Sequence, residues 1–390
     1  MSKTLQDYAT LINDTIQSNE INHYITTDNM CQNLGGIDTF KNINIPQGKV
    51  RSFQKDDVLL SNIRLYFRKV YRAKQKGGCS SDVLVFRAKH IDSATLFAIL
   101  SSQIFTDYAC SGSQGSKMPR GNKTHMMDFK IPTINFTIAK IFNSIQNKIE
   151  NNHKINELLH KILELLYEQY FVRFDFLDEN NKPYQTSGGK MKFSKELNRL
   201  IPNDFEVKTL GELITWISGS QPPKSCHIYE HKEGYIRFIQ NRDYSSNDYI
   251  TYIPISKNNK ICYQYDIMID KYGEAGAVRF GLQGAYNVAL SKISVLNQSM
   301  QEYIRSYLNS KPIKKYLSNA CMASTRSSLN ENHIYSLMLP IPPINLLQKY
   351  EKIAKNIITA IINNNQSTQT LTVLRDFLLP LLLKQQVKPK

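Results

Sequence analysis

Two stretches of this chain repeat apolar residues at intervals that mostly alternate between three and four, one in the middle of the sequence and one at its end. This spacing is typical of a helix that packs lengthwise on a partner helix. Each stretch turns polar near its middle, where asparagines occupy 151–152 and 363–365. At ~1.5 Å per residue, helices of about forty residues would each be roughly 60 Å long. The sequence therefore predicts long helices over 133–174 and 343–385. The apolar positions are Ile134, Ile138, Ile141, Ile145, Ile149, Ile155, Leu159, Ile162 and Leu166 in the first, and Leu347, Tyr350, Ala354, Ile357, Ile361, Leu371, Leu374 and Leu378 in the second.

The two predicted helices belong to a larger internal repeat. Three pairs of similar segments are separated by nearly constant offsets, which indicates a tandem duplication. We therefore predict an α+β fold of two mixed α/β modules, 1–132 and 207–342, each followed by a long helix, with 175–206 as a linker into the second copy. The pairs are KTLQDYATLI and KTLGELITWI from Lys3 and Lys208 (208 − 3 = 205), KDDVLLSNIR and QYDIMIDKYG around Asp57 and Asp266 (266 − 57 = 209), and the Ile-Pro pairs at Ile131 and Ile341 (341 − 131 = 210).

The charge of the chain points to a polyanionic partner. Its 390 residues include 49 Lys and Arg against 33 Asp and Glu, a formal net charge of +16, and nucleic acid is the most common partner of such proteins. An anionic membrane surface is the weaker alternative, because no run reaches the ~20 apolar residues that a membrane span needs. The first residues show no signal pattern and the six cysteines are scattered, so we expect a cytoplasmic chain with reduced thiols.

Basic residues cluster twice in the first module. NIRLYFRKVYRAKQKGG has no acidic residue, and aromatic rings alternate with its basic side chains. Such side chains can neutralise phosphates or reach guanine edges, although a solvated strand pair in a basic protein would look the same. GSQGSKMPRGNKTH combines glycines, which allow a close approach to phosphate, with three more basic residues, but glycine is also common in ordinary loops. The candidate nucleic-acid-binding residues are Arg64, Arg68, Lys69, Arg72, Lys117, Arg120 and Lys123.

The second module has a similar plan with different polar residues. Its candidates lie on an extended segment, in a glycine-rich turn and in a polar loop. Two modules with one plan and divergent polar surfaces would bind two different targets. The candidates are Arg237 and Arg242 in the first segment, Lys271, Tyr272 and Arg279 in the turn, and Arg326 in the loop.

The sequence offers little support for catalysis. Cys226, His227 and His231 lack a second ligand pair at zinc-finger spacing, so we expect no metal site. No GxxxxGK[ST] loop for a nucleotide is present, and the QPPK and IPPIN proline pairs are not the Asn-Pro-Pro-aromatic type that holds a flipped base. The residues therefore favour binding without catalysis and predict no catalytic residue and no cofactor in this chain.

Several joint motifs resemble those of one known family. DVLLSNIRLYFRKV resembles the family's strand followed by Arg, an aromatic or proline pair and Lys-Val, and LYEQYFVRFDF resembles its aromatic-rich helix exit. SGGKMKFSKELNRLIPNDFEVKTLGEL resembles its lead into a second module, with Asn-Asp-Phe where many members carry Gly-Trp, and LRDFLLPLLLKQQ resembles its closing leucine-proline motif. Over nearly its whole length the chain thus resembles the specificity subunit of a type I restriction-modification enzyme.

The resemblance implies an architecture and a set of partners. Each module would be a target recognition domain on double-stranded DNA, and the two helices would pair antiparallel as a coiled-coil spacer. The target would be bipartite, with half-sites about one turn, ~10 bp, apart. Two methyltransferase subunits and the restriction and translocase subunits would dock on the chain, and they would carry S-adenosylmethionine, ATP and Mg²⁺. The candidate docking residues are Phe142, Leu163, Ile358 and Ile362, which would otherwise thicken the seam between the helices.

Other functions remain open at this point. One alternative is a stand-alone sequence-specific DNA-binding protein, and another is the recognition subunit of another DNA-modification defence system. A nuclease or methyltransferase with degenerate motifs and an RNA-binding scaffold are further alternatives, although a scaffold gives no reason for two long paired helices.

Overall fold

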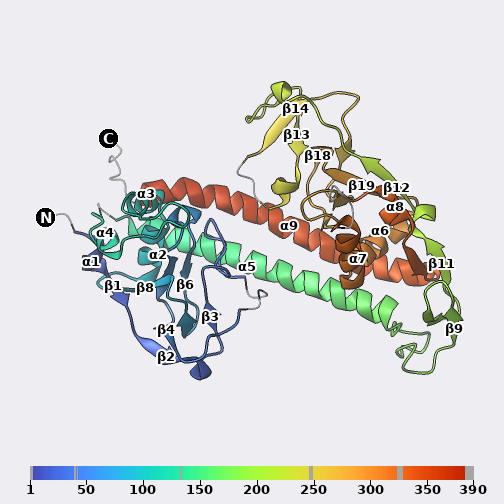
Figure 1. The fold of residues 1–390 in the computed structure, drawn as a ribbon, viewed down its shortest axis with the longest axis horizontal. Coiled ribbons are helices and arrows are strands. Elements are labelled where there is room, and N and C mark those ends of the chain that lie inside the picture. The colour runs from blue at the N-terminus through green and yellow to red at the C-terminus, as the bar shows by residue number, and fades with distance from the viewer. Residues whose placement is uncertain are drawn as a thin grey trace. The chain divides into compact units, whose positions relative to one another are not determined.

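The computed structural model describes residues 3–38, 41, 43–131, 134–245, 249–322 and 328–382. The chain folds as two compact units that both mix helices and strands (Figure 1). Unit 1 comprises residues 1–155 and 364–390, and unit 2 comprises residues 156–363. The long helices α5 (Phe136–Tyr167) and α9 (Ile344–Leu382) each contribute residues to both units.

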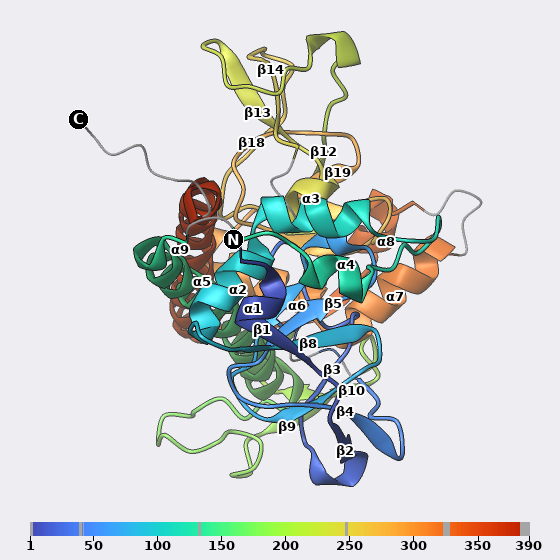
Figure 2. The same ribbon diagram turned by 90° about the vertical axis from the view of Figure 1, so that its left-hand side faces the viewer.

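Unit 1 contains two four-stranded sheets, with strand orders β1-β8-β5-β6 and β2-β4-β7-β3. Helices α2, α3 and α4 lie on one side of the first sheet, and β2 and β4 lie on the other (Figures 1 and 2). Its elements are α1 (Leu5–Tyr8), β1 (Ala9–Ile12), β2 (Thr15–Gln17), β3 (Tyr24–Ile25), β4 (Lys49–Phe53), β5 (Val58–Ser61), the 3₁₀ turn η2 (Leu65–Phe67), β6 (Val70–Arg72), β7 (Gly77–Cys79), β8 (Val83–Ala88), α2 (Ser93–Ser101), α3 (Gln103–Ser111) and α4 (Lys123–Met127).

The first sheet of unit 1 is buried on both faces. Successive side chains of a strand point to opposite faces, so β8 divides its apolar residues between two cores. Leu84 and Phe86 join the core formed with α2 and α3, whereas Val83 and Val85 join the core formed with the second sheet. In DVLVFRA the apolar residues form a continuous run and do not alternate with polar ones. Such a run is what a strand covered on both faces requires.

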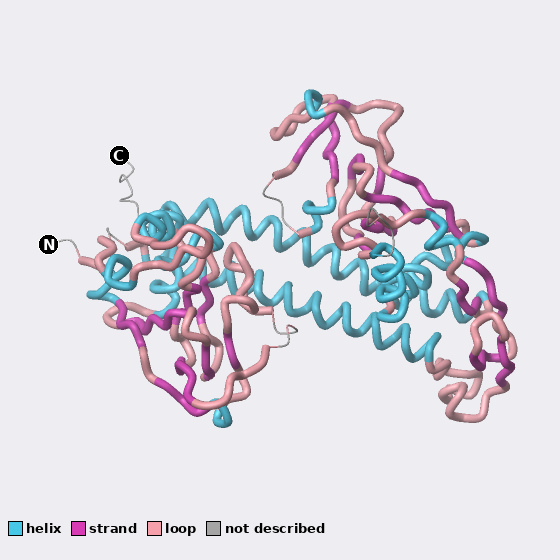
Figure 3. The backbone as a smooth tube through the Cα atoms, viewed as in Figure 1, coloured by secondary structure: helices cyan, strands magenta, loops and turns pink. Residues whose placement is uncertain are grey.

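The two predicted long helices are present as uninterrupted helices of 32 and 39 residues (Figure 3). α5 begins after Asn135, whose Oδ1 accepts the N–H of Ile138 at 3.1 Å, and this cap sets its start three residues beyond the predicted one. It ends in a π-helical turn, η3 (Glu168–Val172). No helix in the described ranges has an apolar stretch that could cross a membrane.

The helices are antiparallel where they pack on each other in unit 1. Asn135 N donates to Leu382 O at 3.0 Å, whereas Asn152, farther along α5, lies beside 364–368 of α9. Of the asparagines predicted as a polar interruption, Asn152 is buried and forms a polar layer between the helices, in which its Nδ2 donates to Thr368 Oγ1 at 3.1 Å. Asn152 is 1% exposed. Because a buried amide needs its partners, such a layer specifies the register of two helices.

The predicted apolar seam of α5 is wrong at three positions. Ile141, Ile155 and Ile162 are 42–49% exposed. The buried face instead includes polar residues, such as Gln146 and Asn152, at positions where apolar periodicity cannot place them. The reason is that α5 packs against both α9 and the first module, so its buried face is wider than a two-helix seam.

Unit 2 repeats the main sheet of unit 1. Its strand order β12-β19-β16-β17 matches β1-β8-β5-β6, which confirms the tandem repeat. The helices that follow the sheet keep a constant offset: 301 − 93 = 208 for α6 and α2, and 344 − 136 = 208 for α9 and α5. The elements are β9 (Met191–Ser194), β10 (Arg199–Pro202), β11 (Glu206–Thr209), β12 (Ile214–Ser218), β13 (Tyr235–Ile239), β14 (Thr251–Pro254), β15 (Ile261–Cys262), β16 (Ile267–Asp270), β17 (Val278–Arg279), β18 (Gly284–Tyr286), β19 (Leu290–Val295), α6 (Gln301–Asn309), α7 (Lys311–Met322), α8 (Glu331–Tyr335) and β20 (Met338–Ile341).

The second sheet differs between the units in one strand. In unit 1, β3 runs parallel to β7 and β2 flanks β4, whereas in unit 2, β13 runs parallel to β18 and β14 flanks β13. The additional strand is therefore on opposite ends of two otherwise equivalent sheets. The modules share a framework and differ in the part of the surface that this strand adds.

The stretch predicted as a linker contains a hairpin of β9 and β10. Ile201 and Phe205 from this stretch belong to the main core of unit 2. Arg199 holds the helix exit, since its Nη2 donates to Phe171 O at 2.9 Å and its guanidinium lies 4.7 Å from the Phe174 ring centroid. The predicted domain boundaries themselves stay a prediction.

Candidate nucleic-acid interface

Both basic stretches of the first module meet in one pair of loops, which we call loop pair 1 (62–69 and 112–122). Arg64 N donates to Pro119 O at 2.9 Å, and Gly121 N donates to Asn62 O at 3.1 Å. A Cβ added at Gly121 would lie 2.8 Å from Leu65 Cδ1, so the loops approach as closely as a glycine allows. The sequence identified both stretches, and the tertiary structure joins them.

Four predicted DNA-binding residues of this module are engaged within unit 1. One donor of each side chain contacts a backbone carbonyl or, for Arg72, lies near a carboxylate, and DNA binding by these four residues stays a prediction. Burial lowers the pKa of both Arg68 and Lys69. The contacts are Arg64 Nη2 to Lys117 O at 3.2 Å, Arg68 Nη2 to Ser101 O at 2.9 Å, Lys69 Nζ to Thr27 O at 2.6 Å, and Arg72 Nε to Asp56 Oδ1 at 3.7 Å.

The other three predicted residues of the first module are exposed. Lys117 lies on the second loop of the pair, and Lys123 is the first residue of α4, after the cap residue Asn122. Arg120 is 62% exposed, although its Nη2 lies 2.9 Å from Asp82 Oδ1. These three cations can reach a phosphate backbone without breaking a buried contact.

Unit 2 has an equivalent loop pair 2, whose described residues are 271–277 after β16 and 328–330 before α8. Leu329 N donates to Lys271 O at 3.0 Å. Tyr272 is 46% exposed, and its carbonyl accepts Asn241 Nδ2 at 3.3 Å. Lys271 Nζ lies 3.4 Å from Ser218 Oγ, and burial lowers the pKa of Lys271. Arg326, also predicted to bind DNA, lies outside the described residues.

Arg279 is paired with two carboxylates, and its DNA binding stays a prediction. Its Nη2 lies 3.0 Å from Asp270 Oδ2, and it also pairs with Glu274, so it ties the end of β16 to the following loop. Arg242 is 53% exposed and stacks at 5.7 Å over Tyr249. Arg237 is partly buried on β13, opposite Tyr252 of β14. Of these three arginines, Arg242 is the one placed for a partner.

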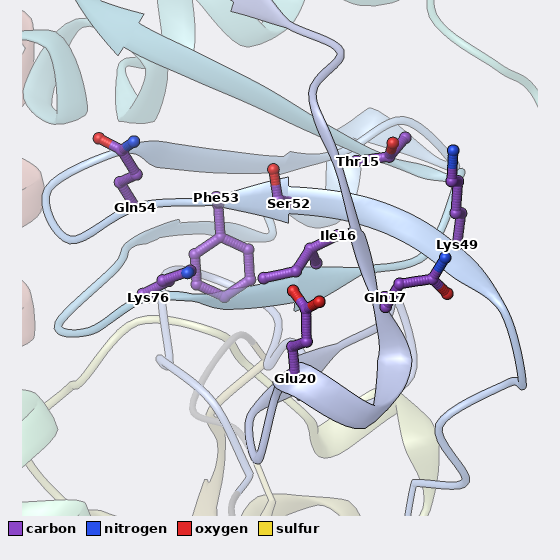
Figure 4. Close-up of a pocket in the computed structure, with 9 residues that line it drawn as sticks. All are labelled: Thr15, Ile16, Gln17, Glu20, Lys49, Ser52, Phe53, Gln54 and Lys76. Carbon is purple, nitrogen blue, oxygen red and sulfur yellow. The ribbon is translucent and has the colours of Figure 1, made fainter.

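The described residues contain no group of three or more His, Cys, Asp or Glu side chains that could hold a metal ion. His227 and His231 pack against rings, with centroids 5.3 Å from Phe238 and 5.4 Å from Tyr252. A hollow of about 450 Å³ lies over β2 and β4 of unit 1 (Figure 4). Glu20, Lys49 and Lys76 are its charged lining residues.

The predicted docking residues are largely buried. Phe142, Ile358 and Ile362 are at most 2% exposed, and the Phe142 ring packs 5.5 Å from that of Phe97 on α2. Leu163 is partly buried against the core of unit 2. These residues take part in packing within the chain, and their docking of partner subunits stays a prediction. The exposed apolar residues of the long helices are Phe136, Ile141, Ile155, Leu158, Ile162 and Leu165 on α5 and Ile344, Ile353, Val373, Leu374 and Phe377 on α9.

Comparison with known proteins agrees with the resemblance in the sequence. Residues 202–373 match the family described as Type I restriction modification DNA specificity domain. The MjaIX specificity subunit of a type I restriction enzyme from Methanocaldococcus jannaschii is 25% identical over 300 residues, which are 74% of this chain and 67% of the relative. The MjaVIII specificity subunit of the same organism is 23% identical over 163 residues, which are 41% of this chain and 37% of the relative.

A solved structure shares the fold. The crystal structure of the S subunit of a type I restriction-modification system from M. genitalium covers 99% of this chain and 96% of that chain, with a TM-score of 0.63 at 15% identity. The family match covers the second repeat, and the first repeat has the same main sheet order. Residues 202–373 therefore resemble the type I restriction modification DNA specificity domain family, and the chain is similar to type I specificity subunits in sequence over 74% of its length and in fold over 99%.

Proposed function

We propose that this chain is the DNA-specificity subunit of a type I restriction-modification system and binds a bipartite DNA target. The two modules bind one half-site each, and the long helices set the distance between the half-sites. The chain carries no catalysis of its own. Methyltransferase subunits modify the target, and restriction and translocase subunits join the complex.

The observation that carries this proposal is one framework used twice with different loops. The main sheets have the same strand order. In unit 1 the loop after β5 is hydrogen-bonded to the segment before α4, and in unit 2 the loop after β16 is hydrogen-bonded to the segment before α8, so the loop pairs lie at the same place in the topology. In the described loop after the central strand, loop pair 1 presents Tyr66, whereas loop pair 2 presents Tyr272 and the carboxylate of Glu274. Two copies of one fold with unlike surfaces are suited to two unlike half-sites.

Exposed apolar residues at equivalent places in the two repeats support docking of two copies of one partner. Phe136 and Ile344 are 50% and 52% exposed and are separated by 344 − 136 = 208 residues. Leu165 and Val373 are 49% and 72% exposed and have the same offset, 373 − 165 = 208. Because each unit contains one residue of each pair, one partner surface fits both units. We assign these positions to the methyltransferase subunits.

S-adenosylmethionine, ATP and Mg²⁺ belong to the partner subunits in this proposal. The chain has no GxxxxGK[ST] loop and no glycine fingerprint for a nucleoside cofactor. The contribution of this chain is recognition of the DNA target sequence.

Methylation mapping tests the proposal directly. DNA from cells that carry this chain with its neighbouring methyltransferase is compared with DNA from cells that lack only this chain. A split motif with an unread gap is expected, and exchanging residues 1–130 for those of another specificity subunit changes one half of it. If no split motif depends on the chain, the proposal is wrong.

A further inference from the structure

The exposed apolar side chains of the first module gather on one cluster of elements. Outside the long helices, the large apolar residues of unit 1 that are exposed in the described ranges are Tyr66 at 53%, Ile104 at 43% and Met118 at 54%. Tyr66 and Met118 lie on the two loops of loop pair 1, and Ile104 lies on α3, which packs against η2. An exposed apolar cluster on an otherwise polar module indicates a contact surface.

The backbone around Tyr66 is held in an uncommon conformation. Arg64 and Arg68 flank η2, and both adopt left-handed backbone angles, with φ of 51° and 49°. Residues other than glycine rarely adopt this region, and such outliers concentrate where surrounding contacts enforce a functional geometry. The sequence pattern alone gives no sign of it, because both positions are arginines.

Both arginines supply the contacts that enforce this geometry. The Arg64 guanidinium bonds across to Lys117 O, and the Arg68 guanidinium bonds to Ser101 O at the end of α2. The loop is fixed from a third side, since Asn33 N donates to Phe67 O at 2.9 Å. These hydrogen bonds hold Arg64, Phe67 and Arg68, and Tyr66 is the residue of η2 whose side chain is exposed to solvent.

Charge around this cluster favours DNA as its partner. Lys117 directly precedes Met118, and Arg120 and Lys123 follow it on the same loop and on α4. Cations beside an exposed ring and a thioether allow phosphate contacts to place apolar groups against base pairs, where they can contact a thymine methyl group or a base step. Loop pair 2 also exposes a ring, that of Tyr272, but its neighbouring cation Lys271 is half-buried.

We propose that Tyr66 and Met118 contact base pairs of the first half-site, and that Arg64 and Arg68 are positioning residues that hold Tyr66 in place. This proposal rests on the proposed function and deepens it. In this proposal Arg64 and Arg68 do not contact phosphates or bases. Their apolar neighbour Tyr66 contacts the bases instead.

The test maps methylation in cells that carry the full chain and its neighbouring methyltransferase. Tyr66→Ala and Met118→Ala are expected to relax the motif at one or two adjacent positions, with the preference for the correct base reduced roughly tenfold. The relaxed half is the one that exchange of residues 1–130 alters. Tyr66→Phe keeps the motif, because the ring makes the contact.

Two further variants separate positioning from charge. Lys117→Ala, on the same loop, lowers methylation similarly at all sites and leaves the motif unchanged. Arg64→Lys keeps the charge but loses the bond geometry to Lys117 O, so it relaxes the same half as Tyr66→Ala. Uniform weakening by Arg64→Lys would overturn its positioning role.

The failures of the two proposals are distinguishable. A wild-type chain that directs no split motif overturns the proposed function, and this proposal with it. A wild-type chain whose split motif is unaffected by Tyr66→Ala and Met118→Ala, or relaxed by them in the other half, overturns this proposal alone.

Discussion

Asp57 and Asp266, which helped to reveal the repeat, carry out the same task in each module. Asp57 Oδ2 accepts Gln54 N at 2.8 Å, and Asp266 Oδ2 accepts Tyr263 N at 2.8 Å, so each closes the turn before a central strand. Each also pairs with a cation on the neighbouring strand: Asp57 lies 2.8 Å from Arg87, and Asp266 lies 3.3 Å from Lys292. Their spacing in the sequence thus reflects a structural requirement.

Asp57→Asn is expected to destabilise unit 1. Asp57 is 2% exposed, and both of its carboxylate oxygens accept hydrogen bonds from Arg87 at 2.8 Å. An asparagine would lose one of these charge-assisted bonds, and its amide N–H₂ donor would face an N–H donor of Arg87. We expect a loss of about 2 kcal/mol in the free energy of unfolding, measured by denaturant unfolding with hydrogen exchange in β5 and β8 as the local reporter.

Asp56→Asn is the matched control. Asp56 is 51% exposed and lies 3.7 Å from Arg72. Removing an exposed ion pair changes stability by roughly 0.5 kcal/mol or less. Equal losses at the two neighbouring positions would contradict the assignment of Asp57 as the structural carboxylate.

Glu351 gives unit 2 a dependence on pH. Its carboxylate accepts the N–H of Glu302 at 2.9 Å, near the start of α6, and burial together with the neighbouring Glu302 raises the pKa of Glu351 to about 7. A carboxyl with a folded pKa above its unfolded value, about 4.3, binds its proton more tightly when folded. Its contribution to stability is therefore complete below pH ~4.3 and is lost as the pH rises through about 7.

Glu351→Gln is expected to flatten this dependence. Between pH 5 and pH 8 the Tm of the wild-type chain should fall relative to that of the variant, as followed by thermal unfolding at matched ionic strength. Glu206→Gln serves as the control, because Glu206 is 73% exposed and removal of its charge leaves the wild-type profile intact. Parallel profiles for wild type and Glu351→Gln would refute the assignment.

At the level of elements, the C-terminal helix α9 is hydrogen-bonded to the segment of the first module that contacts loop pair 1. Arg375 of α9 is 2% exposed, and its Nη1 donates to Asn33 O at 3.2 Å and to Gln146 Oε1 at 3.3 Å. Gln146 of α5 donates to Leu34 O at 2.5 Å. Because Leu34 N in turn donates to Arg68 O at 3.2 Å, both long helices connect through this segment to loop pair 1.

Arg375→Met is expected to loosen loop pair 1 without unfolding unit 1. The methionine fills part of the volume but leaves the buried Gln146 Oε1 and the partly buried Asn33 O without this donor, which costs about 1–3 kcal/mol. The amides of 33–36 and 64–70 should exchange faster with deuterium, and β8 should keep its protection. Arg173→Met, which removes a 66% exposed arginine paired with Glu168, should change neither segment. Unchanged exchange in Arg375→Met would exclude this connection.

For the whole molecule, the two uninterrupted helices that contribute residues to both units are the feature that our proposal uses to set half-site spacing. Insertion of one heptad at equivalent levels of α5 and α9 adds ~10 Å while keeping the apolar face in phase. At ~3.4 Å per base pair, the unread gap should lengthen by about 3 bp with both half-sites unchanged.

Methylation mapping of the insertion variant checks this expectation. The control inserts the same heptad into α5 alone, which shifts the helices out of register at the Asn152 layer and should abolish methylation rather than move the gap. An unchanged gap in the double insertion would show that the helices do not measure the target.

Local periodicity and internal similarity were enough to predict much of the architecture. Helix α5 and helix α9 are periodic over many turns, and the repeat was visible because the turn before β5 and the turn before β16 each need an aspartate. The polar interruption at Asn152 also lies where the sequence placed it. These features depend on near neighbours along the chain, so they are readable from the sequence alone.

Only the tertiary structure decided what the functional side chains face. Arg68 and Lys117 are both cations in loops, yet one bonds Ser101 O and the other lies in solvent. Phe142 and Ile141 are adjacent on one helix, yet one is buried against α2 and the other is 44% exposed. The sequence determined the helices, the repeat and the basic character of the loops. Which residues those loops bury and which they present depended on contacts between segments far apart in the chain, and no local pattern encodes those contacts.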